Sequence, residues 1–245
     1  MQFKPTAPNK DTMSFTTDLT NEVETIFKSS WTTREGQVVP EAGDVQLGNH
    51  AVELDGTVLY ADLAESTNLV NTTKAAFAAE VYKTYLLCAS RIITKNGGTI
   101  TAFDGDRVMG VFIGKSKNTS AAKAALQINY AVQKIINPKL KAQYSSSTYE
   151  VKQSVGVDTC KLFVARTGIR GSNDLVWVGN AANYAAKLCS LRETTHASFI
   201  TEKVFDAMNE EVKFGGNPKQ LMWEKLYWKA LDLYLYRSSW HWNPG

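Results

Sequence analysis

The sequence has few of the residues on which disulfide frameworks and zinc sites depend. Its three cysteines are Cys88, Cys160 and Cys189, and its three histidines lie far apart in the chain. An odd number of irregularly spaced cysteines argues against a disulfide framework and fits a reducing cytoplasm. The scattered histidines argue against a zinc site built from histidine and cysteine. The composition therefore predicts a cytoplasmic protein without a disulfide or zinc scaffold.

The sequence also lacks long apolar runs and a large excess of charge of one sign. No stretch approaches the ~20 apolar residues that span a membrane, and the first residues lack the apolar core of a signal peptide. The 27 Lys and Arg residues against 24 Asp and Glu residues give a net charge of only +3. That excess argues against an extended nucleic-acid surface. We expect a soluble protein with no membrane or nucleic-acid partner, no sensor domain and no second globular module.

What the sequence does contain is enough for one substantial domain. The chain has 245 residues, of which 44% are hydrophobic and 21% are charged. Residues 1–54 predict an N-terminal extension with one amphipathic helix over 17–31. The apolar face of that helix would carry Leu19, Val23, Ile26 and Phe27. Residues 55–245 form the predicted main domain.

Strand and helix patterns alternate regularly in the main domain. A buried strand over 57–63 precedes a long helix that the pair Gly97-Gly98 ends. An Asp-Gly step then joins two strands, and this step is typical of a tight hairpin. Residues 148–168 predict a strand, a turn and another strand. The order of elements predicts an α/β (α+β) sandwich with a ferredoxin-like βααββαβ core and extra C-terminal strands.

Two aspartates stand where this topology would bring them together. Asp62 ends the first strand, and Asp106 lies in the hairpin of the segment FDGDRVMGVF. Each is common in such a place on its own, but two carboxylates a few ångströms apart repel each other unless a cation lies between them. Oxygen ligands of this kind favour Mg²⁺ or Mn²⁺. Asp104 is either a third oxygen donor or a turn residue, and we favour the turn.

The loop after Asp62 is a candidate phosphate-binding segment. Its residues are Ala64, Glu65, Ser66 and Thr67. Backbone N–H groups in a loop that leads into a helix can hold phosphate oxygens. An ordinary connection between a strand and a helix would have the same sequence pattern, so the loop alone does not decide between the two.

Four segments together resemble a known family. In order and spacing, YADLAEST, GGTITAFDGDRVMGVF, SVGVDTCKLFVARTG and VWVGNAANYAAKL are similar to the catalytic domain of class III nucleotidyl cyclases. The resemblance covers roughly residues 55–235 and identifies 55–245 as a cyclase catalytic domain. It implies two divalent ions per site, Mg²⁺ or Mn²⁺, held by Asp62 and Asp106 with the backbone carbonyl of Leu63. It also implies a homodimer whose two active sites each take residues from both chains.

The resemblance implies further site residues on the third helix. Asn183 matches the family's asparagine, and Lys187 stands where the family has an arginine. Lysine keeps the positive charge but lacks the guanidinium fork, and an exposed helix lysine is the alternative interpretation. Arg192 is nearby, on what we expect to be a different part of the helix.

A basic residue for the terminal phosphate is less sharply indicated. Lys161 is placed like a residue that some family members use for this contact. Arg166 and Arg170, next to or within the segment TGIRG, are alternative candidates for this contact.

The choice of nucleotide depends on three positions. Ala102 and Val176 stand where family adenylate cyclases have side chains that read the purine. Neither can form a hydrogen bond to a base through its side chain, and base discrimination depends on such paired groups. Tyr60 shares a strand face with Asp62 and would narrow the base pocket. A pyrimidine nucleotide is therefore favoured, with UTP and then CTP as the expected substrate.

This pattern is similar to the stand-alone bacterial cyclases of the Pycsar anti-phage system. The similarity includes the preceding segment VVPEAGDVQLGNHAVELDGTVLYADL. It implies a cyclic UMP or cyclic CMP product that acts on a separate effector. Three alternatives remain: a purine cyclase, a non-catalytic nucleotide-binding module, and a palm-type polymerase or diguanylate cyclase. The helix AANYAAKL has no place in the last of these.

Overall fold

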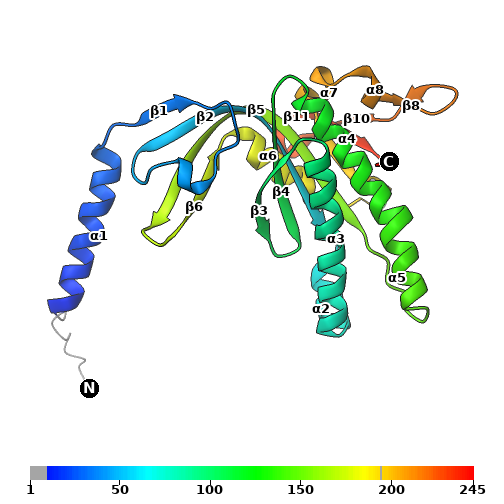
Figure 1. Ribbon diagram of the computed structural model, residues 1–245, viewed down its shortest axis with the longest axis horizontal. Coiled ribbons are helices and arrows are strands. Elements are labelled where there is room, and N and C mark those ends of the chain that lie inside the picture. The colour runs from blue at the N-terminus through cyan, green and yellow to red at the C-terminus, as the bar shows by residue number, and fades with distance from the viewer. Residues whose placement is uncertain (1–9, 194) are drawn as a thin grey trace.

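One large mixed sheet organises the protein. The computed structural model describes residues 10–193 and 195–245. Seven strands follow the order β10-β11-β7-β5-β2-β4-β3, with β1 on β2 and β6 on β5 as additional pairs (Figure 1). The strands are β1 (Thr32–Glu35), β2 (His50–Leu63), β3 (Thr99–Asp104), β4 (Arg107–Ile113), β5 (Gln153–Ile169), β6 (Ser172–Val178), β7 (Ser198–Thr201), β8 (Phe214–Gly215), β9 (Gln220–Leu221), β10 (Glu224–Trp228) and β11 (Leu233–Ser238).

Helices cover the two faces of this sheet unequally. The helices are α1 (Lys10–Lys28), α2 (Ser66–Thr72), α3 (Ala75–Lys95), α4 (Lys117–Tyr130), α5 (Asn137–Gln143), α6 (Asn180–Cys189), α7 (Glu202–Ala207) and α8 (Glu210–Lys213), with short helical turns η1 (Ala42–Asp44), η2 (Ala131–Ile136) and η3 (Lys229–Leu231). The observed order of strands and helices is the predicted βααββαβ core with extra C-terminal strands. The predicted fold class is confirmed.

Strand β2 shows how the sequence assigns the two faces. Leu59, Ala61 and Leu63 pack into the cluster that contains side chains of α3 and α4. Val58 packs instead with Ala181 and other small residues of α6. Because successive strand side chains point to opposite faces, the even-numbered residues of β2, Asp62 included, face the α6 side.

Helix α6 lies unusually close to β5. A Cβ on Gly156 would come within 2.1 Å of the carbonyl oxygen of Ala185 and 2.4 Å of the Cys189 nitrogen. Only glycine leaves room for this approach. The contact fixes the C-terminal end of α6 over the sheet, beside the end of β2 that carries Asp62.

The N-terminal extension is joined to the main sheet. The predicted boundary at residues 54/55 falls inside β2, which runs without a break from His50. Strand β1 pairs in parallel with its first residues, and Val52 and Leu54 are buried. The turn-rich sequence before residue 55 hid this pairing, because the strand partners of residues 51–54 lie more than 100 residues later in β5.

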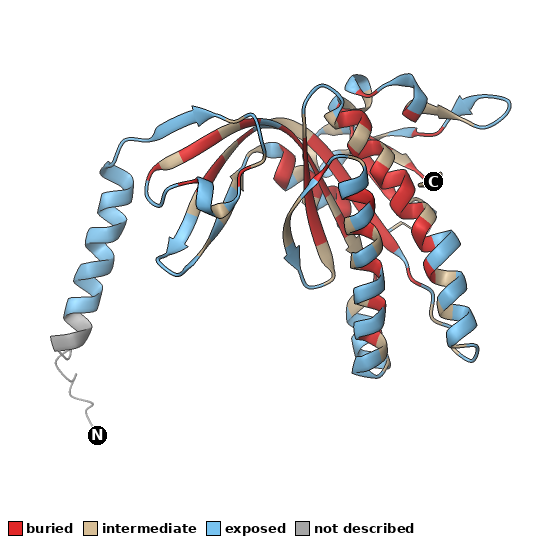
Figure 2. Ribbon diagram, in the orientation of Figure 1, coloured by how far each residue is buried: buried red, intermediate tan, exposed pale blue. Residues whose placement is uncertain are grey.

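Helix α1 projects from the rest of the chain (Figure 1). It ends earlier than the predicted helix over 17–31, because the Asn49 side chain donates hydrogen bonds to the carbonyls of Ile26 and Ser29. Its predicted apolar face is solvent-exposed, with Phe27 84% exposed (Figure 2). No helix among the described residues is long and apolar enough to cross a bilayer.

Candidate active site

Asp62 is the second-last residue of β2, which lies between two neighbouring strands of the sheet. It is paired with Arg107 of β4 on one side and with Ser154 of β5 on the other. Its side chain is only 17% exposed. Burial raises the pKa of the Asp62 carboxyl, and the charge of Asp106 raises it further, against the lowering effect of Arg192. A carboxylate held in this way gains from any additional cation.

Asp106 follows Gly105 in the turn that joins β3 and β4. Gly105 has a φ of 61°, which glycine adopts at little cost. The Oδ2 atom of Asp106 is buried and has no hydrogen-bond partner among the described residues. An orphaned carboxylate oxygen is costly in a protein interior. The strand end and the hairpin therefore bring two carboxylates together, one of them with an unused oxygen.

Asp104 forms an ion pair with Arg107 of the same hairpin. Its Oδ2 accepts a hydrogen bond from Arg107 at 2.6 Å, and its side chain is 77% exposed. The Arg107 guanidinium also lies 5.3 Å from the centre of the Tyr60 ring. These contacts agree with a structural role for Asp104 in the turn. They also place Tyr60 on the same face as Asp62 and beside the hairpin.

Arg192 is the residue that sequence reasoning placed wrongly. It lies beyond the end of α6, and its Nη2 donates to Asp62 Oδ2 at 2.8 Å and to the Leu63 carbonyl at 3.4 Å. The sequence predicts it on a different part of the helix, and this prediction is wrong because α6 ends at Cys189. Its partners lie about 130 residues earlier in the chain, so the only sequence signal is an arginine shortly after the helix.

Asn183 and Lys187 lie one turn apart on the outer face of α6. Both are exposed, whereas Ala181, Ala185 and Leu188 on the inner face are buried against the sheet. Neither side chain forms a hydrogen bond or ion pair with a described residue. The structure therefore does not bring these two residues onto the aspartates of the same chain.

Two of the basic residues considered for the terminal phosphate, Lys161 and Arg166, do not lie beside Asp62 of the same chain. Lys161 is paired with Asp55, seven residues along β2 from Asp62, which corresponds to about 23 Å along the strands. Arg166 is used structurally, because its side chain donates to Asn173 Oδ1 at 2.7 Å and to the Val45 carbonyl.

The loop over residues 64–67 has a constrained backbone. The Ala64 N–H donates to the Lys152 carbonyl at 2.8 Å. Glu65 adopts φ 61° and ψ 26°, a left-handed conformation that costs a non-glycine residue of order 1 kcal/mol. Its carboxylate lies 3.5 Å from the Lys152 ammonium. Ser66 and Thr67 open α2 directly afterwards. Such strain is typical of loops that serve a site.

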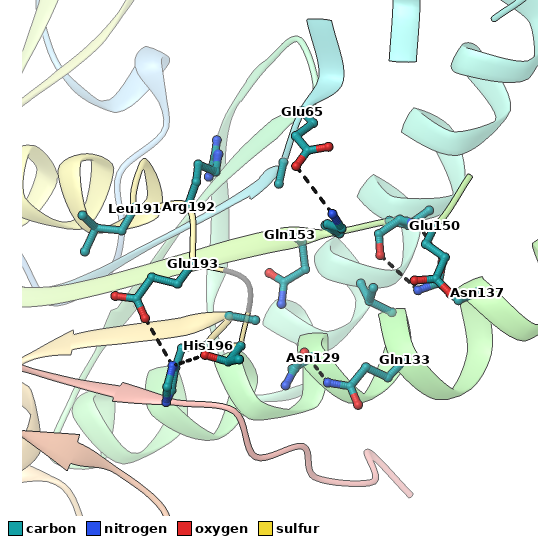
Figure 3. Close-up of a pocket in the computed structure, with 16 residues that line it drawn as sticks. Glu65, Asn129, Gln133, Asn137, Glu150, Gln153, Leu191, Arg192, Glu193 and His196 are labelled. Atoms are coloured by element: carbon teal, nitrogen blue, oxygen red, sulfur yellow. Dashed lines mark hydrogen bonds and ion pairs between the residues drawn. The ribbon is translucent and has the colours of Figure 1, made fainter. Parts of the chain in front are cut away.

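A cavity of about 260 Å³ lies beside this loop (Figure 3). Its wall includes Glu65, Gln153, Arg192, Glu193 and His196. Figure 3 shows Glu193 directed toward His196, with Arg192 extending away from that pair. Arg192 therefore lines the cavity and also contacts Asp62.

The two predicted base-reading positions remain apolar and accessible. Ala102 is half-buried opposite Met109, and Val176 is 40% exposed on β6. Neither surface offers a side-chain hydrogen bond to a base.

Solved structures place this fold among the class III cyclases. The guanylyl cyclase Cya2 superposes with a TM-score of 0.64 at 18% identity, over 78% of this chain and 95% of that one. The adenylyl cyclase CyaB from P. aeruginosa superposes with a TM-score of 0.60 at 23% identity, over 77% and 95%. The architecture is that of a class III nucleotidyl cyclase domain.

Sequence relatives narrow the class. No family model matches the chain. A uridylate cyclase from Xanthomonas perforans is 50% identical over 94% of this chain and 99% of its own length. Uridylate cyclases from Burkholderia cepacia and a Rhodovulum species are 46% and 41% identical over 94% and 95% of this chain and 100% and 99% of their own. The chain belongs to the family of these uridylate cyclases.

Proposed function

We propose that this protein is a uridylate cyclase that converts UTP into 3′,5′-cyclic UMP and pyrophosphate. The observation that carries the proposal is the 50% identity to a uridylate cyclase over nearly the whole of both chains. In this reaction the ribose 3′-oxygen forms a bond to the α-phosphorus and loses its proton. The bond from that phosphorus to the bridging oxygen breaks, and pyrophosphate leaves. No covalent intermediate with the protein is needed.

The donor set of the site fits Mg²⁺ or Mn²⁺. The orphaned Oδ2 of Asp106 and the nearby Asp62 carboxylate are hard oxygen ligands, and the Leu63 carbonyl lies at the same strand end. The described residues contain no cluster of three or more His, Cys, Asp or Glu side chains. Backbone and phosphate oxygens would therefore complete the coordination of two ions per site. Bound there, such ions lower the pKa of the 3′-hydroxyl and neutralise triphosphate charge.

The chain's own residues support a pyrimidine at the base position. The Tyr60 ring is held by the Arg107 guanidinium on the face that carries Asp62. A fixed ring there would reduce the space for the base. Ala102 and Val176 provide no polar partner for a purine edge. Residues 64–67 and Lys161 are proposed contacts of the triphosphate. CTP is the second candidate substrate, since the two pyrimidines differ only at one side of the ring.

We propose a homodimer with two shared active sites. Asn183 and Lys187 lie on the exposed side of α6 without partners among the described residues, and Lys161 lies far along the strand from Asp62. A second copy would bring these three residues to the aspartates of the first. Asn183 and Lys187 would then orient the ribose and stabilise charge on the transferring phosphoryl group, and Lys161 would contact the terminal phosphate. A closed two-fold dimer makes both sites equivalent.

A four-nucleotide assay tests the proposed reaction. The full chain is incubated separately with ATP, GTP, CTP and UTP plus Mn²⁺, and the products are resolved by mass. We expect cyclic UMP and pyrophosphate from UTP, with Asp62→Ala and Asp106→Ala variants inactive. Cyclisation of a purine as the main activity would contradict the proposal. Binding of UTP without release of pyrophosphate would instead support a non-catalytic nucleotide-binding module.

The cellular role is a further part of the proposal. We infer that the protein acts in the cytoplasm and that its cyclic product switches on a separate effector in anti-phage defence. The similarity to the Pycsar cyclases over the segment around Asp62 supports this role. Cells that carry the chain together with an effector that responds to cyclic UMP should resist phage infection, and an Asp62→Ala variant should remove that resistance.

A further inference from the structure

Arg192 contacts two of the oxygens proposed to hold a metal ion. Its Nη2 donates to Asp62 Oδ2 at 2.8 Å and to the Leu63 carbonyl at 3.4 Å. A divalent cation on Asp62 Oδ2 and the Leu63 carbonyl would repel a guanidinium that contacts the same two oxygens. An ion that binds Asp62 Oδ2 and the Leu63 carbonyl must therefore displace Arg192.

We propose that Arg192 is an internal cation that competes with metal at this site and then serves the triphosphate once it is displaced. The inference rests on the proposed function, because it needs the Asp62 site to bind metal. It makes metal and nucleotide binding interdependent. A metal ion that binds alone must break the Arg192–Asp62 ion pair without compensation. When the ion binds together with a nucleotide, the triphosphate offers the displaced Arg192 guanidinium a new anionic partner.

The surroundings of Arg192 allow the side chain to move while Glu193 stays in place. On one side the guanidinium also donates from Nη1 to the Cys189 carbonyl at the end of α6, and this second contact must break or turn when the side chain moves. On the other side Glu193 is held by Arg237 at 2.7 Å and by His196 at 3.2 Å. The Arg192 side chain itself is 37% exposed and lies along the wall of the cavity (Figure 3). The neighbouring Glu193 side chain is thus held in place, whereas the partly exposed Arg192 side chain borders the open space of the cavity.

The charges around the cavity direct the displaced guanidinium toward the nucleotide. Of the three carboxylates that line the cavity, Glu65 and Glu193 already have cationic partners, Lys152 and Arg237, and Glu150 on the far wall forms no ion pair with a described residue. A triphosphate beside residues 64–67 would offer unpaired phosphate oxygens at the same end of β2. Arginine binds such oxygens in a bidentate manner that lysine cannot reproduce. Arg192 would in this way supply the guanidinium fork that Lys187 lacks.

Metal binding by the protein without nucleotide tests the competition directly. Mn²⁺ affinity is measured by electron paramagnetic resonance and calorimetry for the wild type and for Arg192→Ala. We expect Arg192→Ala to bind Mn²⁺ about tenfold more tightly, since the competing ion pair is gone. Arg91→Ala is the matched control, because Arg91 is an exposed arginine on α3. Equal Mn²⁺ affinities of wild type and Arg192→Ala would overturn the proposal.

A second measurement tests the role after displacement. UTP binding in the presence of Mn²⁺ should weaken about tenfold or more in Arg192→Ala, although its free metal affinity has risen. Arg192→Gln preserves most of the side-chain volume and should show the same opposite shifts if Arg192→Ala folds poorly. An unchanged UTP affinity in both variants would contradict the phosphate role.

The outcome for Asp62→Ala separates this inference from the proposed function. If Asp62→Ala abolishes Mn²⁺ binding and Arg192→Ala leaves it unchanged, the metal site stands and the competition fails. If Asp62→Ala binds Mn²⁺ like the wild type, the metal site itself is refuted.

Discussion

Asp106 places a buried carboxylate oxygen without a partner beside the carboxylate of Asp62. The arrangement is unfavourable until a cation or a hydrogen-bond donor satisfies the free oxygen, or the charge is removed. We expect Asp106→Asn to stabilise the protein in chelator by about 1 kcal/mol, a rise in Tm of about 2–4 °C. The same change should reduce cyclase activity at least about 100-fold, because a metal ligand is lost. Thermal unfolding and product formation measure the two effects.

Asp104→Asn is the control from the same hairpin. It removes an exposed carboxylate that pairs with Arg107, so activity should stay within a few-fold of the wild type. A loss as large as that of Asp106→Asn would identify Asp104 as a third metal ligand instead of a turn residue.

Asp158 is a buried carboxyl outside the proposed site. It is 1% exposed, accepts a hydrogen bond from Thr201 at 2.5 Å, and has a pKa raised mainly by burial. An acid with a raised folded-state pKa binds protons more tightly when folded than when unfolded. Its contribution to stability is therefore greatest at low pH and declines as pH rises through and above the ordinary value of 3.8.

Asp158→Asn keeps the shape of the side chain and removes this titration. The stability of the wild type relative to Asp158→Asn should fall as the pH rises from below 3.8 toward neutrality. Urea unfolding at a series of pH values measures the difference. A difference that stays constant, or that grows with pH, would show that burial does not penalise the Asp158 charge.

At the scale of elements, α6 depends on one glycine of β5. A methyl group on Gly156 would lie 2.1 Å from the Ala185 carbonyl oxygen, so the helix must shift to accept it. We expect Gly156→Ala to destabilise the protein by about 3 kcal/mol and to abolish activity, since α6 carries Asn183 and leads into Arg192. Gly43→Ala, where a Cβ meets nothing within 4 Å, should change neither property. Urea unfolding measures the change in stability of each variant, and the cyclase assay measures its activity.

The sequence predicted the elements whose residues show strict periodicity. The buried strand expected over 57–63 is the second half of β2, and the Asp-Gly step correctly predicted the β3–β4 hairpin. The turn expected within 148–168 does not exist, because β5 runs from Gln153 to Ile169 as one strand. Its polar residue Asp158 looks like a turn residue but is buried and hydrogen-bonded to Thr201.

Long-range contacts limited the prediction of the candidate site. Asp62 and Asp106 could be paired because the topology makes their strands neighbours. The contact of Arg192 with Asp62 depends on how the chain leaves α6, and no local pattern encodes that path. Sequence spacing alone does not tell which way Asn183 and Lys187 face, but the shared site that the resemblance implies requires them on an exposed surface, which is where they lie.

At the scale of the whole molecule, the side chains of α1 over residues 14–28 are all exposed. Its exposed apolar side chains are Phe15, Leu19, Val23, Ile26 and Phe27. An isolated helix of 19 residues is marginally stable in water. In the proposed dimer a second copy would cover this apolar face. Hydrogen exchange in α1 should therefore slow as protein concentration rises, while exchange in the buried strand β2 stays constant. Fast, concentration-independent exchange in α1 would exclude it from the interface.

The shared site makes a stronger prediction about pairs of inactive chains. Asp62→Ala removes the metal half of one chain, and Asn183→Ala removes the ribose-orienting half of the other. In a heterodimer of these variants one site combines both defects, while the second combines an intact Asp62 with an intact Asn183. Random pairing of equal amounts makes half of the dimers heterodimers, so about one quarter of wild-type activity should return on mixing. Heterodimers verified by native mass spectrometry that remain inactive would place Asn183 in the same site as the Asp62 of its own chain.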